Sequence, residues 1–245
     1  DPYRRFKHPA SKDAEDLLGE EEVAAEEEGQ ATEAGGPMIE RAKNLLGKDF
    51  LGIEAIKAME AKFKSIGVNV EFIIDHLPNF HYTEEDLRIA KENGEMGVLR
   101  PEAMLMGGRQ VDLTVIELRD LFQKDPQGKL THPVYPYDWF NNEAWAKNPA
   151  EMKASWAIVK KDVLDGSTSK TCNDQETILR QYEAGLQRKG ARNATVRRRT
   201  VLEAVWDSML YYTTNGKRIL QDKWDWTQTR TSHGHMVLVG YFDQY

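Results

Sequence analysis

Ser167 and Lys170 have the residue types and spacing of a catalytic pair. They match the bare Ser-x-x-Lys pattern, in which a lysine one helical turn after a serine activates the hydroxyl for acyl transfer. The Lys-Thr-Gly and Ser-Asp-Asn motifs that accompany this pair in such enzymes are absent from the sequence. Because Ser, Thr and Lys are also ordinary turn residues, we interpret the segment as a turn or helix cap.

His233 and His235 form a second candidate pair, for metal binding. On an extended strand the two imidazoles would lie on the same face, a spacing that strand-borne metal sites use. No spacing in the sequence nominates a third or fourth ligand. The further histidines and aspartate that could serve are His76, His81, His132 and Asp243. We therefore favour an exposed turn and predict no metal site.

A basic segment is the candidate for nucleic-acid binding. It contains Arg188, Lys189, Arg192, Arg197, Arg198 and Arg199. Clustered arginines bind phosphate, and the N-terminus of a helix adds a favourable field. We expect the helix to begin near Val196, so that successive arginines point about 100° apart and cannot all face one ligand. We expect one of them to pair with the acidic tail or with a neighbouring carboxylate.

Two aromatic segments are candidates for a contact surface. Rigid rings provide contact area at low entropic cost, although aromatic side chains are more often packed in the core. For residues 130–150 we favour a connection that plugs the space between two layers, and we keep recognition as the alternative. The candidate binding residues in the two segments are Tyr135, Tyr137, Trp139, Trp145, Trp224 and Trp226.

The acidity of the chain is confined to its first segment. The 245 residues carry a formal net charge of −7. Residues 1–37 hold 4 of the 33 basic and 11 of the 40 acidic residues, so 29 of each remain in 38–245. Residues 1–37 have few large apolar side chains, which predicts a disordered acidic tail that carries no specific chemistry or, alternatively, binds a basic partner. Because the chain begins at Asp1 and Met38 is a plausible start, we expect a processed form, a fragment or an upstream-extended reading frame.

Composition and motifs exclude several classes of protein. No apolar run approaches the roughly 20 residues of a membrane helix, and no secretory signal follows Asp1. The single cysteine, Cys172, excludes an internal disulfide and a Cys-x-x-Cys pair. Glycine-rich nucleotide-binding motifs, His-Glu-x-x-His and Gly-x-Ser-x-Gly are also absent. We expect no cofactor, no membrane association and a cytoplasmic location.

Residues 38–128 show mainly helical periodicity. The spacing predicts two helices over 38–65, broken near Gly47, and a strand over 68–74. Thr83 with Asp86 predicts a capped helix over 84–93, and a short strand follows at 96–100. A second capping pair, Thr114 with Glu117, predicts a helix that runs to about 123.

Residues 129–245 combine helices with a strand-rich end. Residues 156–164 are ambiguous between strand and helix, and Asn173 or Asp174 is expected to cap a helix over 175–188. The strongest apolar stripe predicts a helix over 196–212 that Gly216 ends. Strands are expected around 224–228 and over 236–239. The chain ends soon after, so either the last strand inserts centrally or the sequence is truncated.

Four motifs carry a resemblance to known proteins. They are Gly47-Lys-Asp-Phe-Leu-Gly-Ile53, Asp165-Gly-Ser-Thr-Ser-Lys-Thr171, Trp226-Thr-Gln-Thr-Arg-Thr-Ser and Val237-Leu-Val-Gly240-Tyr-Phe-Asp243. Together they resemble a family of hypothetical proteins from uncultured bacteria. The closing segment is similar to C-type-lectin-like modules of the formylglycine-generating-enzyme type and to the variable proteins of diversity-generating retroelements. The resemblance implies that ligand-contacting residues lie in a further segment, which is missing after Tyr245.

The sequence as a whole predicts an α+β fold. We expect a disordered acidic tail (1–37), a mainly helical region with one or two short strands (38–128), and a smaller α+β region (129–245). The leading functional hypothesis is a non-enzymatic binding or interaction protein whose partner is a protein or a small ligand. The alternatives are a nucleic-acid-associated protein that uses 188–199, and a hydrolase or metal enzyme.

Overall fold

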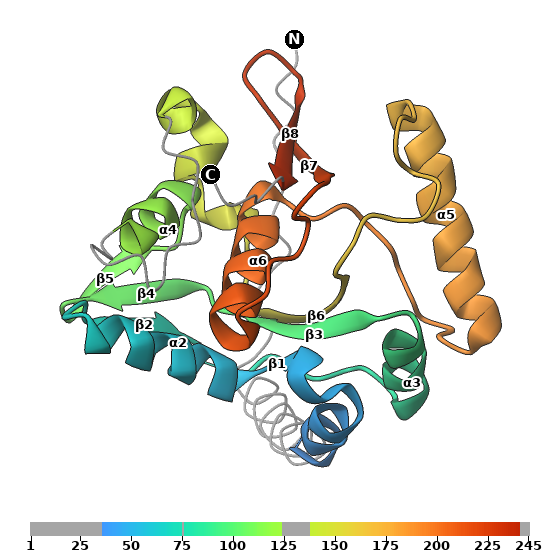
Figure 1. Ribbon diagram of the computed structural model, residues 1–245, viewed down its shortest axis with the longest axis horizontal. Helices are drawn as coiled ribbons and strands as arrows, with labels where there is room; N and C mark the ends of the chain where they lie inside the picture. Colours follow the sequence, from blue (N-terminus) through green and yellow to red (C-terminus); the bar gives the residue numbers. More distant parts are fainter. Residues whose placement is uncertain (1–35, 75, 124–137, 241–245) are drawn as a thin grey trace, which may run out of the picture.

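The α+β class is confirmed by the computed structural model, which describes residues 36–74, 76–123 and 138–240 (Figure 1). The predicted tail, Tyr135 and Tyr137 lie outside these residues. Helices and small sheets alternate along the chain, and the two regions expected on either side of residue 128 share a sheet.

The first helical stretch breaks where the sequence predicts. Residues 36–46 are helical, a short 3₁₀ turn η1 spans Gly47–Asp49, and strand β1 is Phe50–Leu51. Gly47 has φ of 57°, a left-handed conformation that glycine adopts without steric cost. Helix α2 then runs over Ile53–Ser65, and its inner face lies in the core.

Two three-stranded sheets form the base of the molecule. In the first, β3 (Glu95–Arg100) lies between β1, to which it is parallel, and the antiparallel β6 (Ser155–Lys160). The ambiguous segment beginning at 156 is therefore a strand. The second sheet has the order β2 (Val70–Ile73), β4 (Ala103–Met106) and β5 (Arg109–Asp112).

The β4–β5 hairpin corrects the expectation of only one or two strands in 38–128. Gly107 and Gly108 form its turn with φ of 58° and 83°. Two successive positive φ values give a turn whose twist matches paired strands. The strands on either side are only four residues long, too short for a clear alternating pattern.

The capped helices largely follow the prediction. Helix α3 (Glu84–Glu92) begins with the Thr83–Asp86 capping box, and α4 (Val115–Phe122) begins with the Thr114 hydroxyl accepting from the Glu117 amide. Three short 3₁₀ turns, η2 (Trp139–Asn142), η3 (Ala144–Lys147) and η4 (Pro149–Glu151), precede β6.

The two later helices start at different residues from those predicted. Helix α5 spans Cys172–Lys189, and its capping box is formed by Thr171 and Asp174. Helix α6 spans Val201–Asn215 with Thr200 and Glu203 as its capping box, so the helix start expected at 196 is wrong. Residues 197–199 consequently precede α6 as irregular chain.

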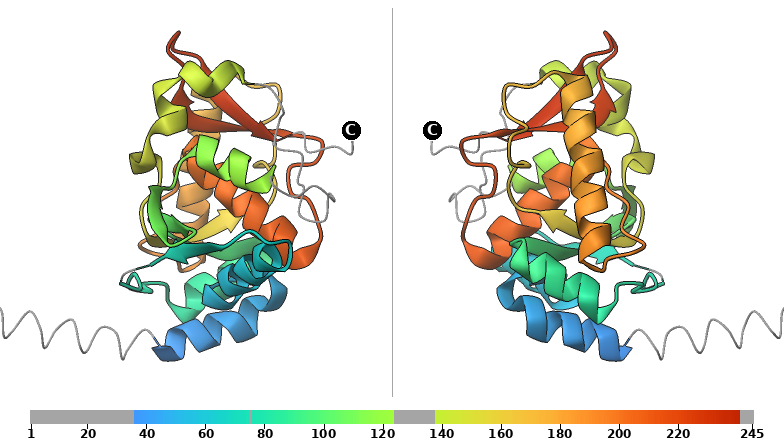
Figure 2. Two further views of the ribbon diagram at one scale, coloured as in Figure 1. Left: turned by 90° about the vertical axis from the view of Figure 1, so that its left-hand side faces the viewer. Right: turned by 90° about the vertical axis from the view of Figure 1, so that its right-hand side faces the viewer.

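Helix α6 is the centre of the molecule. It lies between the sheets and the hairpin of β7 (Trp224–Arg230) and β8 (Met236–Gly240), which confirms the two predicted strands (Figures 1 and 2). Trp206 is completely buried, and its indole N–H donates to the carbonyl of Leu99 at 3.1 Å. Helix α5 differs from α6: it runs along the flank of the molecule and none of its residues is fully buried.

Candidate functional site

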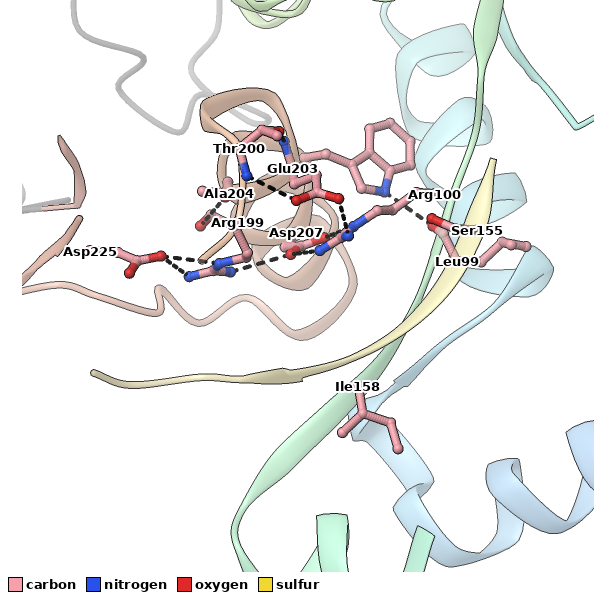
Figure 3. Close-up of polar contacts among 12 residues, drawn as sticks. Leu99, Arg100, Ser155, Ile158, Arg199, Thr200, Glu203, Ala204, Asp207 and Asp225 are labelled. Atoms are coloured by element: carbon pink, nitrogen blue, oxygen red, sulfur yellow. Dashed lines mark hydrogen bonds and ion pairs between the residues drawn. The ribbon is translucent and has the colours of Figure 1, made fainter. Parts of the chain in front are cut away.

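A network of charged side chains joins the sheet, α6 and the C-terminal hairpin (Figure 3). Three arginines and three carboxylates take part, so their formal charges balance. The members of this charge network are Arg100, Arg197, Arg199, Glu203, Asp207 and Asp225.

Arg100 connects β3 to α6. Its guanidinium donates to Asp207 from Nε at 3.0 Å and from Nη2 at 2.7 Å, and to Glu203 from Nη1 at 2.6 Å. The side chains of Arg100, Glu203 and Asp207 are only 3, 5 and 0% exposed. Glu203 and Asp207 are four residues apart, so they lie on one face of α6. Charges so deeply buried are tolerated because each one is paired and hydrogen-bonded.

Arg199 connects α6 to β7. It donates to Asp225 from Nε at 3.0 Å and from Nη2 at 2.6 Å, and to Asp207 from Nη1 at 3.3 Å. Burial acts to lower the pKa of Arg199, but the charges of Asp225 and Asp207 outweigh it and raise that pKa. The network therefore fixes the hairpin to the central helix through ion pairs on both sides of Arg199.

Glu203 also binds Arg197, the exposed member of the network. Arg197 donates to its carboxylate at 2.6 and 2.7 Å, and the Thr200 amide donates at 2.9 Å. Burial acts to raise the pKa of Glu203, but the Arg197 hydrogen bonds and the charge of Arg100 outweigh it, and the pKa is lowered. Arg197 itself is 56% exposed, so it covers the network from the solvent side.

The basic segment that is the candidate for nucleic-acid binding contributes Arg197 and Arg199 to this network. Arg198 completes the set: its Nε donates to Glu176 of α5 at 2.9 Å, and its Nη1 donates to the carbonyl of Trp226 at 3.1 Å. We expected one of the three arginines to pair with a carboxylate, but all three do so: Arg197, Arg198 and Arg199. The reason is that they precede α6 as irregular chain, which lets their side chains reach different elements.

Of the other three basic residues, Arg188 and Lys189 lie in the last turn of α5 and Arg192 follows the helix. Lys189 donates to the side-chain oxygen of Asn93 at 3.1 Å. Arg188 and Arg192 are exposed and make no ion pair within the part of the chain that the structure describes. Cations at a helix C-terminus also interact favourably with the helix dipole, so their position has a structural explanation.

The first aromatic segment is divided between core and surface. Trp145 is only 7% exposed and stacks on Phe140, with ring centroids 5.8 Å apart. It therefore belongs to the core, as the packing interpretation predicts, and not to a contact surface. Trp139 lies at the edge of this cluster and is 54% exposed.

The second aromatic segment lies on the hairpin, whose two faces differ. The inner face places Thr227, Val237 and Val239 in the core beneath the strands. The opposite face, here called the outer face of the hairpin, consists of Trp224, Trp226 and Leu238. Trp224 is 43% exposed and Leu238 is 40% exposed, and Trp226 lies opposite Leu238 in the strand register.

Hydrogen bonds hold the hairpin in place around this face. The Gln228 amide donates to the Arg199 carbonyl at 2.8 Å, and the Thr229 hydroxyl donates to the Glu151 carboxylate at 2.5 Å. At the tip, the amide and hydroxyl of Ser232 donate to the carboxylate of Glu143, at 2.8 and 3.0 Å. Glu143 lies between η2 and η3, so the tip of the hairpin is fixed to the first aromatic segment.

The two candidate catalytic and metal-binding pairs lie in turns. Ser167 and Lys170 precede the Thr171 cap of α5, with Ser169 at φ of 57° between them, which confirms the turn interpretation. His233 and His235 flank Gly234 in the exposed hairpin tip and are on neither strand. Over residues 36–74, 76–123 and 138–240, no three His, Cys, Asp or Glu side chains are grouped so as to hold a metal ion.

One polar cluster was not anticipated from the sequence. The Tyr182 hydroxyl of α5 donates to the Glu95 carboxylate of β3 and accepts from Asn93 Nδ2 at 3.2 Å. Burial raises the pKa of Glu95, although the Tyr182 hydrogen bond and the charge of Lys160 partly oppose this. Burial and the bond to Glu95 also raise the pKa of Tyr182. The only signal in the sequence was the apolar spacing of Ile178 and Tyr182 on one helix face.

Comparison of the chain with protein-family models, with curated proteins and with solved structures finds no match in any of the three. Among the helices that the structure describes, none combines the length and apolar character needed to cross a membrane. What the chain is similar to therefore contributes nothing to the assignment, and a function has to be argued from the geometry of its own residues.

Proposed function

We propose that this chain is a non-enzymatic binding protein and that it contacts a partner protein through the outer face of the hairpin. The observation that carries the proposal is the exposure of Trp224 and Leu238, 43 and 40%, on a two-stranded unit whose other face packs on the core. Large apolar side chains clustered on a surface are typical of contact sites, and tryptophan is the residue most enriched among binding hot spots.

The rigidity of the hairpin supports the same proposal. A surface already fixed before binding loses little conformational entropy when the partner docks. Here the Arg199–Asp225 pair and the Thr229–Glu151 hydrogen bond fix the strands from behind. The resemblance of this segment to C-type-lectin-like modules is compatible with a binding role. We place that role in the cytoplasm, where a single free cysteine such as Cys172 is stable as a thiol.

The alternatives have less support. A nucleic-acid function would rely on Arg188, Lys189 and Arg192, because Arg197–Arg199 are engaged with carboxylates. Binding of that kind would weaken steeply with salt. A hydrolase or metal enzyme would need the Ser167–Lys170 or His233–His235 pair, and both lie in exposed or half-exposed turns.

The test places a photo-crosslinking amino acid on the surface in question. Gln228 is exposed on β7 and its backbone amide, not its side chain, makes the contact to Arg199, so p-benzoylphenylalanine at this position would preserve the fold. We expect irradiation in an extract of the source organism, treated with nuclease, to yield a discrete protein adduct. The double variant Trp224→Ser/Leu238→Ser should abolish that adduct.

The matched control is Ile53→Ser on α2, because Ile53 is 42% exposed, nearly the same as Trp224. It should leave the adduct unchanged. An adduct that persists in the double variant, or is lost equally in the Ile53 control, refutes the proposed face. An adduct that forms in untreated extract but not in nuclease-treated extract would favour the nucleic-acid alternative.

A further inference from the structure

A cavity of about 260 Å³ opens between α5 and the end of β6. It is lined by Lys160, Leu164, Asp165, Ile178, Gln181 and Tyr182. Helix α5 forms one wall as it runs along the flank of the molecule (Figure 2). The remaining wall is the end of β6 and the chain that follows it.

Lys160 provides a positive charge that makes no contact ion pair with a described carboxylate. Its ammonium lies 5.7 Å from the centre of the Tyr182 ring and donates to the Asn93 carbonyl at 3.3 Å. Within the described residues no carboxylate comes within ion-pair distance of it. Two nearby lysines behave differently: Lys161 and Lys223 each contact an aspartate at 2.7 Å.

Asp165 provides the complementary negative charge at the rim. It is exposed and precedes Gly166, whose φ of 74° turns the chain toward the N-terminus of α5. Its carboxylate has no hydrogen bond or ion pair among the residues that the structure describes. The cavity thus has one cation and one anion without a contact ion pair among the described residues, and both line the same space.

The space between the two charges is partly apolar. Leu164 and Ile178 are half-buried there, and the Tyr182 ring forms an aromatic wall. The ring is held in position because its hydroxyl is hydrogen-bonded to both Glu95 and Asn93. Preorganised walls of this kind lower the entropic cost of binding a small molecule.

We infer that this cavity binds a zwitterionic ligand of amino-acid size, with its carboxylate on Lys160, its ammonium on Asp165 and its apolar part against Ile178 and Tyr182. A volume of about 260 Å³ lies just below the usual range for small-molecule sites and is too small for a nucleotide or a drug-sized ligand. The lining of the cavity includes none of the outer-face residues Trp224, Trp226 and Leu238, so the inference does not rest on the proposed function.

Isothermal titration calorimetry of the full chain tests the ligand chemistry with three probes of nearly the same shape. L-leucine carries both charges, 4-methylpentanoate only the carboxylate and 3-methylbutylamine only the ammonium. We expect saturable binding of L-leucine and at least a roughly tenfold weaker affinity for each single-charge analogue. Equal affinity for L-leucine and either analogue, or no saturable binding of L-leucine, overturns the inference.

Two variants assign the charges. Lys160→Met retains the length of the side chain and Asp165→Asn retains its shape, and each should weaken L-leucine binding at least about tenfold. Lys170→Met removes an exposed positive charge outside the cavity and should bind like the wild type. Asp165 is exposed, so its variant carries the test even if the Lys160 variant is poorly folded. Wild-type affinity in Asp165→Asn overturns the assignment.

Discussion

Neutralising Asp207 should be among the most destabilising conservative changes in the chain. Asp207 is completely buried and accepts three hydrogen bonds, two from Arg100 and one from Arg199. Asp207→Asn keeps the shape of the side chain and removes one of three negative charges that balance three arginines. Because a buried charge left without its partner is destabilising, we expect a loss of about 3–5 kcal/mol in the free energy of unfolding.

The measurement is equilibrium unfolding of the full chain in urea, followed by tryptophan fluorescence and by circular dichroism. Trp206 lies one residue before Asp207 and is completely buried, so its exposure to water on unfolding contributes to the change in total tryptophan emission. A domain has a total stability of only about 5–15 kcal/mol, so the expected loss is a large fraction of it. The midpoint should fall at unchanged slope if the transition remains two-state.

The matched control is Glu54→Gln, which removes the same kind of charge from a surface pair. Glu54 contacts Lys43 at 2.7 Å with 66% of its side chain exposed, and exposed pairs contribute about 0–1 kcal/mol. If Asp207→Asn costs less than about 1 kcal/mol, and so resembles Glu54→Gln, the argument that burial makes these pairs interdependent is refuted.

Three further predictions concern pH and helix capping. The pKa of Glu203 is lowered in the folded protein. Its stabilisation is therefore present above the ordinary glutamate pKa of about 4.3 and is lost as the pH falls through the folded pKa. Glu203→Gln should flatten the acid side of a profile of unfolding free energy against pH. Glu95 has the opposite sign: its raised pKa means that stability falls as the pH rises from about 4.3 through the folded pKa. Glu95→Gln should therefore remove that decline, and a variant whose profile still declines over this interval contradicts the assignment. Thr200→Ala removes the hydroxyl that accepts from the Glu203 amide, and should lower the unfolding free energy by about 1 kcal/mol, whereas Thr214→Ala on the exposed end of α6 should have little effect.

Much of the secondary structure could be predicted because its causes lie within a few residues. The break at Gly47, the Thr83–Asp86 capping box and the stop at Gly216 each depend on local backbone conformation or on contacts three residues apart. The capping box of Thr200 and Glu203 was equally present as Thr-x-x-Glu, and it would have placed the start of α6 correctly. The β4–β5 hairpin was missed because strand pairing, rather than propensity, stabilises such short strands.

The candidate sites divide in the same way. The histidine turn is exposed because it surrounds a glycine, and this could be read from the sequence. Trp224 is exposed because it lies on one side of an alternating strand, which the sequence also indicated. The partners of the arginines did not follow, because Arg199 meets Asp225 and Arg100 meets Asp207 across 26 and 107 positions of the chain. The sequence shows the number of charges but not their distances.

Local order and global charge pairing therefore have different origins in this protein. Side-chain periodicity, caps and glycines specify where helices and strands form, since these effects act over one or two turns of chain. Tertiary packing alone decides that Arg197–Arg199 pair with carboxylates on other elements, and that Lys160 and Asp165 line one cavity. The physical reason is that the energy of a charge depends on its burial and on the distance to its partners, and packing sets both.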